Sequence, residues 1–254
     1  MNILTVITPS HQRLYREFFL KNLPADATVL EKHLLTSGDG GYLSTDWQDG
    51  VTAKLRWALE YLSNTEPGAL FVLSDIDILL YPSLSMTELE QEIMTPNLDI
   101  VFQRETSAPD CHEANTGFYI ARNCPYVRNL LTTALEVCDR SETKNDQTAI
   151  NSLLAPADFN IRWGLLPTRY YARSQGYPPP RSIVLHHANC TDSVAQKVSQ
   201  LRRVEKYNHT RSGRAVLILI ELWEYAASGK LRRMLLQRLG DRALQRKVHS
   251  EQIL

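Results

Sequence analysis

The segment Phe71-Val-Leu-Ser-Asp-Ile-Asp-Ile-Leu-Leu-Tyr-Pro82 is the most informative stretch of the chain. Its apolar run is too short to cross a membrane and is typical of a buried strand in a parallel sheet. Asp75 and Asp77 interrupt the run, and two like charges this close are costly to bury without a positive charge beside them. A divalent cation supplies that charge, because Asp oxygens are preferred ligands of Mg²⁺ and Mn²⁺. The alternative is a strand end that carries two solvated acids.

The composition is that of an ordinary globular protein. The chain has 254 residues, of which 43% are hydrophobic and 22% charged, enough for the core of one large α/β domain or two small ones. Its cysteines lack Cys-x-x-Cys spacing, so neither a zinc site nor a disulfide framework is expected. The cysteines are Cys111, Cys124, Cys138 and Cys190. The chain opens on an apparent strand rather than a signal peptide, and we expect a cytoplasmic protein.

The charges are unevenly distributed along the chain. From Arg202 to the end there are 12 Lys and Arg against 5 Asp and Glu, whereas the preceding residues carry 16 against 23. An acidic body with a basic tail predicts attachment to an anionic surface. No nucleic-acid partner is expected.

Hydrophobic periodicity predicts alternating strands and helices in the first third of the chain. We expect strands at residues 3–7, 29–35 and from 69, helices at 12–21 (with Ser10 as N-cap) and 49–62, and a loop at 37–41. This order predicts a right-handed, mostly parallel sheet, in which ligands collect at the carboxyl ends of the strands. Thr8, Ser10, Asp75 and Asp77 all fall at such ends, so we expect them in one crevice.

The remainder of the chain continues the alternation. Helices are expected at 86–93, 125–138, 145–154 and 193–206, strands at 99–102, 114–121, 162–166 and 182–189, and loops at 103–113 and 170–180. Tyrosines in the last loop (Tyr170, Tyr171 and Tyr177) are interpreted either as a platform for an acceptor sugar or as a packed lid. The sequence predicts one domain over residues 1–206 and a basic helical tail over 207–254.

Four motifs occur in order: Val72-Leu-Ser-Asp-Ile-Asp77, Asn115-Thr-Gly-Phe118, Asn145-Asp-Gln-Thr-Ala-Ile-Asn151, and His187-Ala-Asn189 followed by Lys197. Together they resemble the nucleotide-diphospho-sugar transferase family, which consists of glycosyltransferases with the GT-A fold. The resemblance covers residues 1–205. It implies a Rossmann-like, three-layer α/β fold and transfer of a sugar, with retention of configuration, from a nucleoside diphosphate to a glycan or lipid-linked glycan. A UDP-sugar is the favoured donor, and Mn²⁺ or Mg²⁺ would bridge protein and diphosphate.

The expected chemistry assigns roles to the metal ligands. Cleavage of the anomeric bond leaves a diphosphate that gains negative charge, which a bound cation stabilises. Asp77 is expected to bind the cation directly, Asp75 to reach the ribose hydroxyls or, through water, the cation, and His187 to be the third protein ligand. The alternative for His187 is a structural hydrogen bond. His186, which alternation sends to the opposite face, serves as the control residue.

Other residues are expected around the donor. Thr8 and Ser10 are placed to bind the base or ribose, and Lys54 to reach the nucleotide. Lys197 either offsets phosphate charge or is a solvated helix lysine.

The sugar side of the pocket has its own candidates. Asn115 and Gly117 would line it, the glycine because close backbone approach needs no side chain, unless it marks a bulge. Asp146 and Gln147 are the candidates for the reacting centre, unless Asn145 or Asp146 only caps a helix.

The tail combines an apolar segment at 216–227 with an amphipathic segment at 231–239 that has Leu and Met on one side and Arg on the other. This composition is typical of a helix lying in a membrane interface, and it predicts peripheral contact through residues 215–254 at the inner face of the membrane. A helical hairpin packed on the body or a dimer contact is the alternative.

Three other functions fit parts of the pattern. A haloacid dehalogenase-type phosphatase also carries Asp-x-Asp after a strand, but has Thr or Val where this chain has Leu79. A nucleotidyltransferase needs a Gly-rich basic loop after the first strand, which is missing here. A non-catalytic module that binds sugar nucleotides remains the third.

Overall fold

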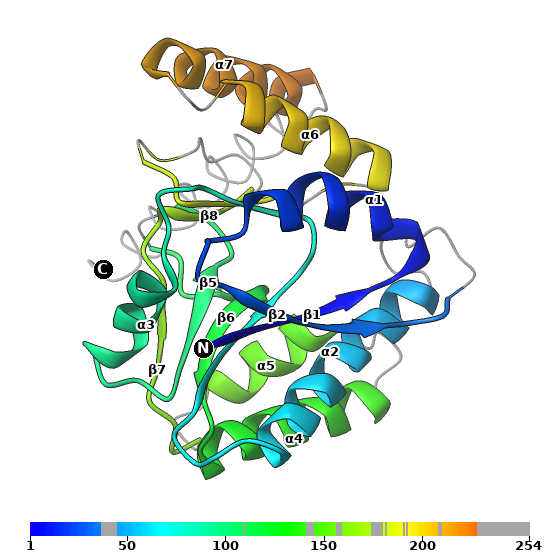
Figure 1. Cartoon of the computed structure of the whole chain (residues 1–254), viewed down its shortest axis with the longest axis vertical. Helices are drawn as coiled ribbons and strands as arrows, with labels where there is room; N and C mark the ends of the chain where they lie inside the picture. The colour runs from blue at the N-terminus through cyan, green and yellow to red at the C-terminus, as the bar shows by residue number, and fades with distance from the viewer. Residues whose placement is uncertain are drawn as a thin grey trace, which may run out of the picture.

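The computed structural model describes residues 1–36, 45–108, 110–140, 145–155, 159–173, 180, 182–189, 191, 193–207 and 210–227. Its centre is a six-stranded sheet with the order β2-β1-β3-β6-β5-β7 (Figure 1). The strands are β1 (Asn2–Ile7), β2 (Thr28–His33), β3 (Leu70–Ser74), β5 (Ile100–Arg104), β6 (Ala114–Arg122) and β7 (Trp163–Leu165). Only β6 runs antiparallel to its neighbours within this sheet, which confirms the predicted mostly parallel α/β fold.

A second sheet of three strands, in the order β4-β9-β8, lies beside the first. It consists of β4 (Ile78–Leu80), β8 (Tyr170–Ala172) and β9 (Leu185–His187). The segment 71–82, expected to be one strand, is therefore two strands in two sheets, joined through Asp75, Ile76 and Asp77. The turn is fixed at both ends, because the Asp75 N–H donates to the Gly117 carbonyl (2.7 Å) and the Ala188 N–H donates to the Asp77 carbonyl (2.9 Å).

The expectation of a loop at 170–180 was wrong for its first residues. Tyr170–Ala172 form β8, which pairs in parallel with β9. Tyr170 and Tyr171 are buried, at 1% and 2% exposure, so neither ring is available as a sugar platform. The strand depends on pairing with a segment about fifteen residues later, a tertiary contact that local composition does not reveal. Tyr177 lies outside the described residues.

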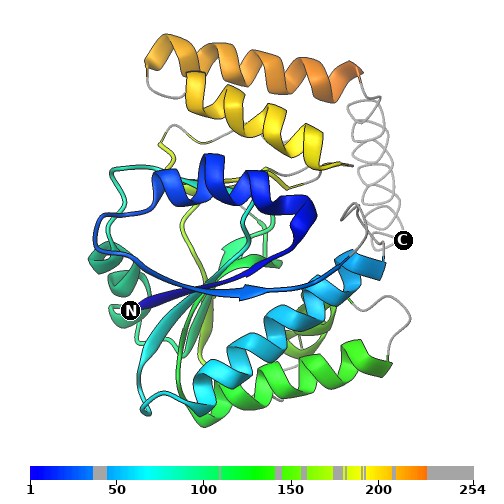
Figure 2. The ribbon, with the colours of Figure 1, turned by 45° about the vertical axis from the view of Figure 1, so that its right-hand side comes forward.

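Strand alternation divides the core between the two faces of the main sheet. Phe71 and Leu73 of β3 pack on one face with three helices, α2 (Thr45–Ser63), α4 (Pro125–Arg140) and α5 (Asp146–Leu154). Val72 packs on the opposite face with Phe19 from the N-terminal helical segment and with α3 (Met86–Met94). Figure 2 shows these layers, with the sheet between the two groups of helices.

The N-terminal helical segment is not the continuous helix predicted for residues 12–21. It is built from η1 (Pro9–His11), α1 (Gln12–Leu14), a π-turn η2 (Tyr15–Phe19) and η3 (Leu20–Asn22). Ser10 lies inside the first turn and is not an N-cap, because its hydroxyl hydrogen-bonds instead with Thr8 Oγ1 (3.1 Å) and His11 Nδ1 (2.9 Å).

Two helices, α6 (Val194–Tyr207) and α7 (Arg211–Ala227), cover the outer side of the N-terminal helical segment (Figure 1). Leu217 of α7 is buried in an apolar cluster with Leu14, Phe18 and Leu201, so the start of the predicted tail packs on the body. Within the described residues, no helix is long and apolar enough to cross a membrane. The segments 37–41 and 231–239 lie outside those residues, and the division at residue 207 stays a prediction.

The core position of β3 predicts the cost of removing its aromatic side chain. Phe71 is fully buried between the rings of Tyr61 (5.3 Å) and Tyr119 (6.2 Å). Phe71→Ala should lower the free energy of unfolding by about 3–5 kcal/mol, because it leaves a cavity. Tyr126→Ala, at a side chain 47% exposed, should cost less than about 1 kcal/mol. Urea denaturation measures both, and equal costs would contradict this description of the core.

Candidate functional site

The turn between β3 and β4 places two carboxylates next to the end of β9. Antiparallel pairing sets Ile78 opposite His187, so the histidine arrives beside Asp77 although it lies over a hundred residues later. One ligand atom from each of Asp75, Asp77 and His187 lies within 4.8 Å of the other two. Ligands on opposite sides of a Mg²⁺ ion are about 4 Å apart. Small side-chain rotations would therefore let the three residues share one ion.

The two adjacent histidines have different surroundings. His187 Nε2 is 3.4 Å from Asp77 Oδ1, and its Nδ1 is 2.9 Å from Gln103 Oε1. His186 points to the other face, where its Nε2 is 2.9 Å from Gln200 Nε2 and its ring contacts Tyr171. Burial lowers the pKa of His186 to about 3, which keeps it neutral. His186 therefore belongs to the protein core and not to the cluster of Asp75, Asp77 and His187.

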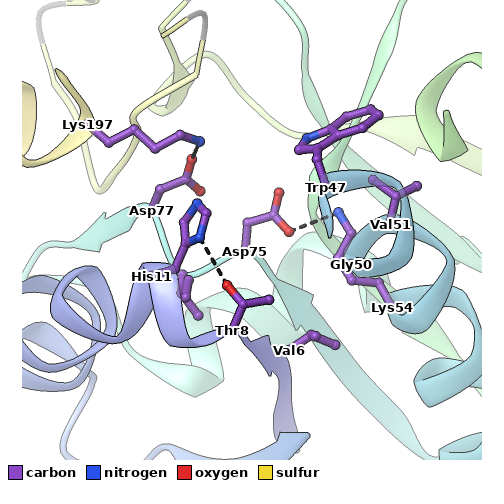
Figure 3. A pocket seen from close by; sticks show the side chains of 11 residues that line it. Val6, Thr8, His11, Trp47, Gly50, Val51, Lys54, Asp75, Asp77 and Lys197 are labelled. Atoms are coloured by element: carbon purple, nitrogen blue, oxygen red, sulfur yellow. Dashed lines mark hydrogen bonds and ion pairs between the residues drawn. The ribbon is translucent and has the colours of Figure 1, made fainter. Parts of the chain in front are cut away.

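Two lysines lie beside the carboxylates (Figure 3). Lys54 Nζ from α2 is 2.9 Å from Asp75 Oδ1 and 3.5 Å from Asp146 Oδ2, and Lys197 Nζ from α6 pairs with Asp77 Oδ2. Burial favours the neutral form of Asp77, but Lys197 holds the pKa of its carboxyl well below the usual range. Burial also opposes the charge of Lys54, but Asp146 and Asp75 raise its pKa. The site therefore combines ionised carboxylates with ammonium groups.

Asp146 is buried at the first turn of α5. Asn145 is the N-cap, since its Oδ1 accepts from the Thr148 N–H at 3.1 Å. Asp146 accepts the Gln147 N–H with its Oδ1 at 2.9 Å, and its Oδ2 faces Lys54. Burial raises the pKa of its carboxyl, Lys54 opposes this rise, and Asp75 adds to it. The charge of Asp146 is consequently linked to the Asp75–Lys54 pair.

Gly117 of β6 has no side chain, and His187 and Asp75 occupy the space that a side chain would fill. A Cβ built on Gly117 would collide with His187 Cε1 and would lie 2.8 Å from Asp75 Oδ2 and 3.0 Å from Asn115 Oδ1. The Gly117 N–H donates to Asn115 Oδ1 at 2.9 Å. Gly117 therefore lets side chains approach its backbone closely, which is one of the two alternatives given for it in the sequence analysis. The β5–β6 pairing is also irregular in this region.

Glu105 was missed by the sequence analysis. Its Oε2 accepts from Asn115 Nδ2 (2.6 Å) and Gln147 Nε2 (3.0 Å), and its Oε1 accepts from Asn189 Nδ2 (3.3 Å). Burial raises the pKa of the Glu105 carboxyl, against the lowering effect of these hydrogen bonds. One carboxylate thus orders three amides from three motifs. Its position in an expected polar loop gave no signal for this role.

A pocket opens next to the metal-ligand cluster (Figure 3). Its lining includes five predicted residues, namely Thr8, Lys54, Asp75, Asp77 and Lys197, together with His11, Trp47, Gly50, Val51, Val6 and Ile76. Ser10 does not line the pocket, but its hydroxyl hydrogen-bonds with His11, which does. His11 and Trp47 were missed, because neither residue belongs to a motif. Burial, with Lys197 adding to its effect, lowers the pKa of His11.

The predicted residues fall into two connected groups. One group lines the pocket, and the other (Asn115, Gly117, Asp146 and Gln147) lies on β6 and α5, outside the pocket lining. Lys54 joins the two groups, because it pairs with both Asp75 and Asp146, and Glu105 connects Asn115 with Gln147 inside the second group. The structure thus brings the predicted residues into one region, whereas their chemical roles stay predictions.

Comparison with known proteins identifies solved structures of similar fold. No family model matches the chain, and no curated protein is similar in sequence. A glycosyltransferase involved in glycosylation of the major capsid of PBCV-1 is similar in structure, with a TM-score of 0.56 and 14% identity over 79% of this chain and 98% of that one. The bifunctional glycosyltransferase WbbM gives a TM-score of 0.54 and 9% identity over 76% of this chain and 46% of that one.

The glycosyltransferase GlyE of Streptococcus pneumoniae gives a similar result. Its TM-score is 0.51, with 9% identity over 88% of this chain and 63% of that one. The fold of the chain is therefore the GT-A fold of glycosyltransferases, as the motifs implied.

The contacts of Gly117 predict a strong effect of one methyl group. Gly117→Ala should abolish Mn²⁺ binding measured by isothermal titration calorimetry, because the Cβ displaces His187 or Asp75. Gly68→Ala is the control, since Gly68 has φ of +85° and lies outside the site; it should cost about 1–2 kcal/mol of stability and preserve Mn²⁺ binding. A Gly117→Ala protein with wild-type Mn²⁺ affinity would contradict the described geometry.

Proposed function

We propose that the protein is a metal-dependent glycosyltransferase that uses a nucleoside diphosphate sugar as donor, with a UDP-sugar favoured. The observation that carries this proposal is the convergence of Asp75, Asp77 and His187 at the edge of a pocket in a GT-A fold. Two carboxylates and one imidazole suit Mn²⁺ and also accommodate Mg²⁺. The acceptor is proposed to be a glycan or a lipid-linked glycan.

The proposed metal site would stabilise the leaving group. A bound divalent cation acts as a Lewis acid on the diphosphate, whose charge grows as the sugar departs. Lys197 lines the pocket next to Asp77, where its ammonium group can bind phosphate oxygens. We assign Thr8 and Ser10 to the ribose or base, and the neighbouring His11 and Trp47 supply ring surfaces for the base.

The second group of residues is assigned to the sugar. Asn115 and Gln147 present amides that Glu105 orients, and amides of this kind hold sugar hydroxyls. Asp146 and Gln147 are proposed at the reacting centre, with Lys54 linking Asp146 to Asp75. We propose retention of anomeric configuration from the family resemblance, and NMR of the anomeric proton of the product tests it.

The alternative functions predict different experimental results. The fold comparison argues against a haloacid dehalogenase-type phosphatase. A non-catalytic module would bind the donor with Mn²⁺ but would neither hydrolyse nor transfer the sugar, even with a panel of acceptors. A cytoplasmic location stays an expectation from the sequence.

The ligand assignment predicts which histidine matters. Asp77→Asn and His187→Ala should abolish the Mn²⁺-dependent rise in melting temperature that a UDP-sugar produces, because ligand binding to the native state raises Tm. His186→Ala should lower the melting temperature of the free protein, since it removes a buried ring, and keep the ligand-dependent rise. Equal loss in all three variants would contradict the assignment, and a rise without Mn²⁺ would contradict metal dependence.

We also propose that the region from α7 onward contacts a membrane surface. One side of α7 packs on the body through Leu217, while another exposes Val216, Leu219, Leu222 and Trp223. Leu219 and Trp223 are the most exposed, at 65% and 74%. Together with the basic composition that follows Arg202, these side chains suit an anionic lipid interface.

Removing the two most exposed apolar side chains tests this contact. The double variant Leu219→Ser, Trp223→Ser should bind anionic vesicles at least about tenfold more weakly in a sedimentation assay, since partial burial of two large side chains exceeds about 1.4 kcal/mol. The control is Tyr126→Ser, Val137→Ser, which removes exposed apolar side chains from α4. Equal vesicle binding by the two double variants would refute membrane contact through α7.

A further inference from the structure

Gln103, at the end of β5, is a fully buried polar residue with no role in the motifs. The register of β5 against β6 shifts between Phe102, which pairs with Tyr119, and Gln103, which pairs with Asn115. Such irregularities redirect side chains. Phe102 packs in the core beside α2 and α4, whereas the Gln103 side chain extends to the second sheet.

The hydrogen bonds of Gln103 have only one consistent direction. Its Nε2 lies 3.1 Å from the Tyr170 main-chain carbonyl, and its Oε1 lies 2.9 Å from His187 Nδ1. A carbonyl oxygen only accepts, so the NH₂ group must face Tyr170. The amide oxygen then faces His187 and also only accepts. His187 Nδ1 must therefore carry a proton.

This proton leaves the other ring nitrogen available. In a neutral imidazole with Nδ1–H, the lone pair is on Nε2. His187 Nε2 is directed at Asp77 Oδ1, 3.4 Å away, within the cluster that includes Asp75. Two lone pairs that face each other across this distance are accommodated by a cation between them.

We propose that Gln103 is a positioning residue that fixes the tautomer and orientation of the His187 ring, so that Nε2 faces a divalent cation held with Asp75 and Asp77. This inference rests on the proposed function, because the metal site belongs to it. The main chain of β8 anchors the arrangement through Tyr170. An amide here accepts the hydrogen bond from Nδ1–H and adds no further charge to a site that already holds two carboxylates.

The neighbouring histidine supplies an internal control. Gln200, also buried, presents its NH₂ group to His186 Nε2 at 2.9 Å, while Arg173 Nη1 donates to Gln200 Oε1 at 3.2 Å. The lone pair of His186 Nε2 is thus occupied by an amide hydrogen. Of the two buried Gln–His pairs among the described residues, only that of Gln103 leaves a nitrogen lone pair facing carboxylates.

The test compares Gln103→Met, Gln103→Glu and Gln200→Met with the wild type. In metal-free protein at alkaline pH, ¹⁵N NMR should show His187 as the Nδ1–H tautomer in the wild type and in Gln103→Glu, which keeps the acceptor. Gln103→Met should lose this preference. Calorimetry should show about 10- to 100-fold weaker Mn²⁺ binding for Gln103→Met, most of the affinity restored in Gln103→Glu, and wild-type affinity in Gln200→Met.

Several results would overturn the inference. They are an Nε2–H tautomer of His187 in the wild type, unchanged Mn²⁺ affinity in Gln103→Met, or an equal loss of affinity in Gln200→Met, which would indicate general loosening of the core. If the wild type binds no Mn²⁺, the metal-dependent function fails, and the NMR comparison alone then decides. A tautomer preference lost in Gln103→Met would still support the assignment to Gln103, and an unchanged tautomer would overturn it.

Discussion

The close approach of Asp75, Asp77 and His187 is the constraint on which the rest of the site depends. Carboxylates at this separation repel each other strongly when they are partly buried. The fold must therefore supply positive charge, or the carboxylates become protonated. Lys54 and Lys197 supply it from helices on two sides of the turn. The resulting balance keeps Asp77 ionised despite its burial.

The two-sheet architecture makes this approach geometrically feasible. The main sheet ends β3 at Ser74, and the second sheet begins β4 at Ile78, so the acidic turn occupies the junction. Pairing of β4 with β9 places His187 beside this turn, and the absence of a side chain at Gly117 leaves room for the imidazole ring. Asn151 of α5 accepts from the Ala114 N–H (2.9 Å) and donates to the Ala114 carbonyl (2.8 Å) at the start of β6. These two hydrogen bonds fix the position of Asp146 relative to Asn115. The residues proposed to bind the sugar and those proposed to bind the metal are therefore held in fixed positions relative to one another.

Sequence reasoning predicted the fold class and most elements, because long periodic helices and buried strands carry strong local signals. It missed β8 and the break of segment 71–82 into two strands, since both depend on pairing with β9. It singled out the acids, His187 and the lysines from their chemistry and order, and the structure brings them together, while their roles stay predictions. It missed Glu105, Gln103, His11 and Trp47, whose importance comes from tertiary contacts alone: a polar side chain in an expected loop gives no sign that it will be buried among amides or against an imidazole.

The central claim is that one divalent cation binds between the β3–β4 turn and the end of β9. Anomalous diffraction at the manganese edge, from crystals grown with Mn²⁺ and a nucleoside diphosphate, tests it most directly. The account predicts one strong peak within bonding distance of Asp77 and His187, with diphosphate oxygens completing the coordination. Bound nucleotide without such a peak, or a manganese ion ligated by other residues, would contradict it.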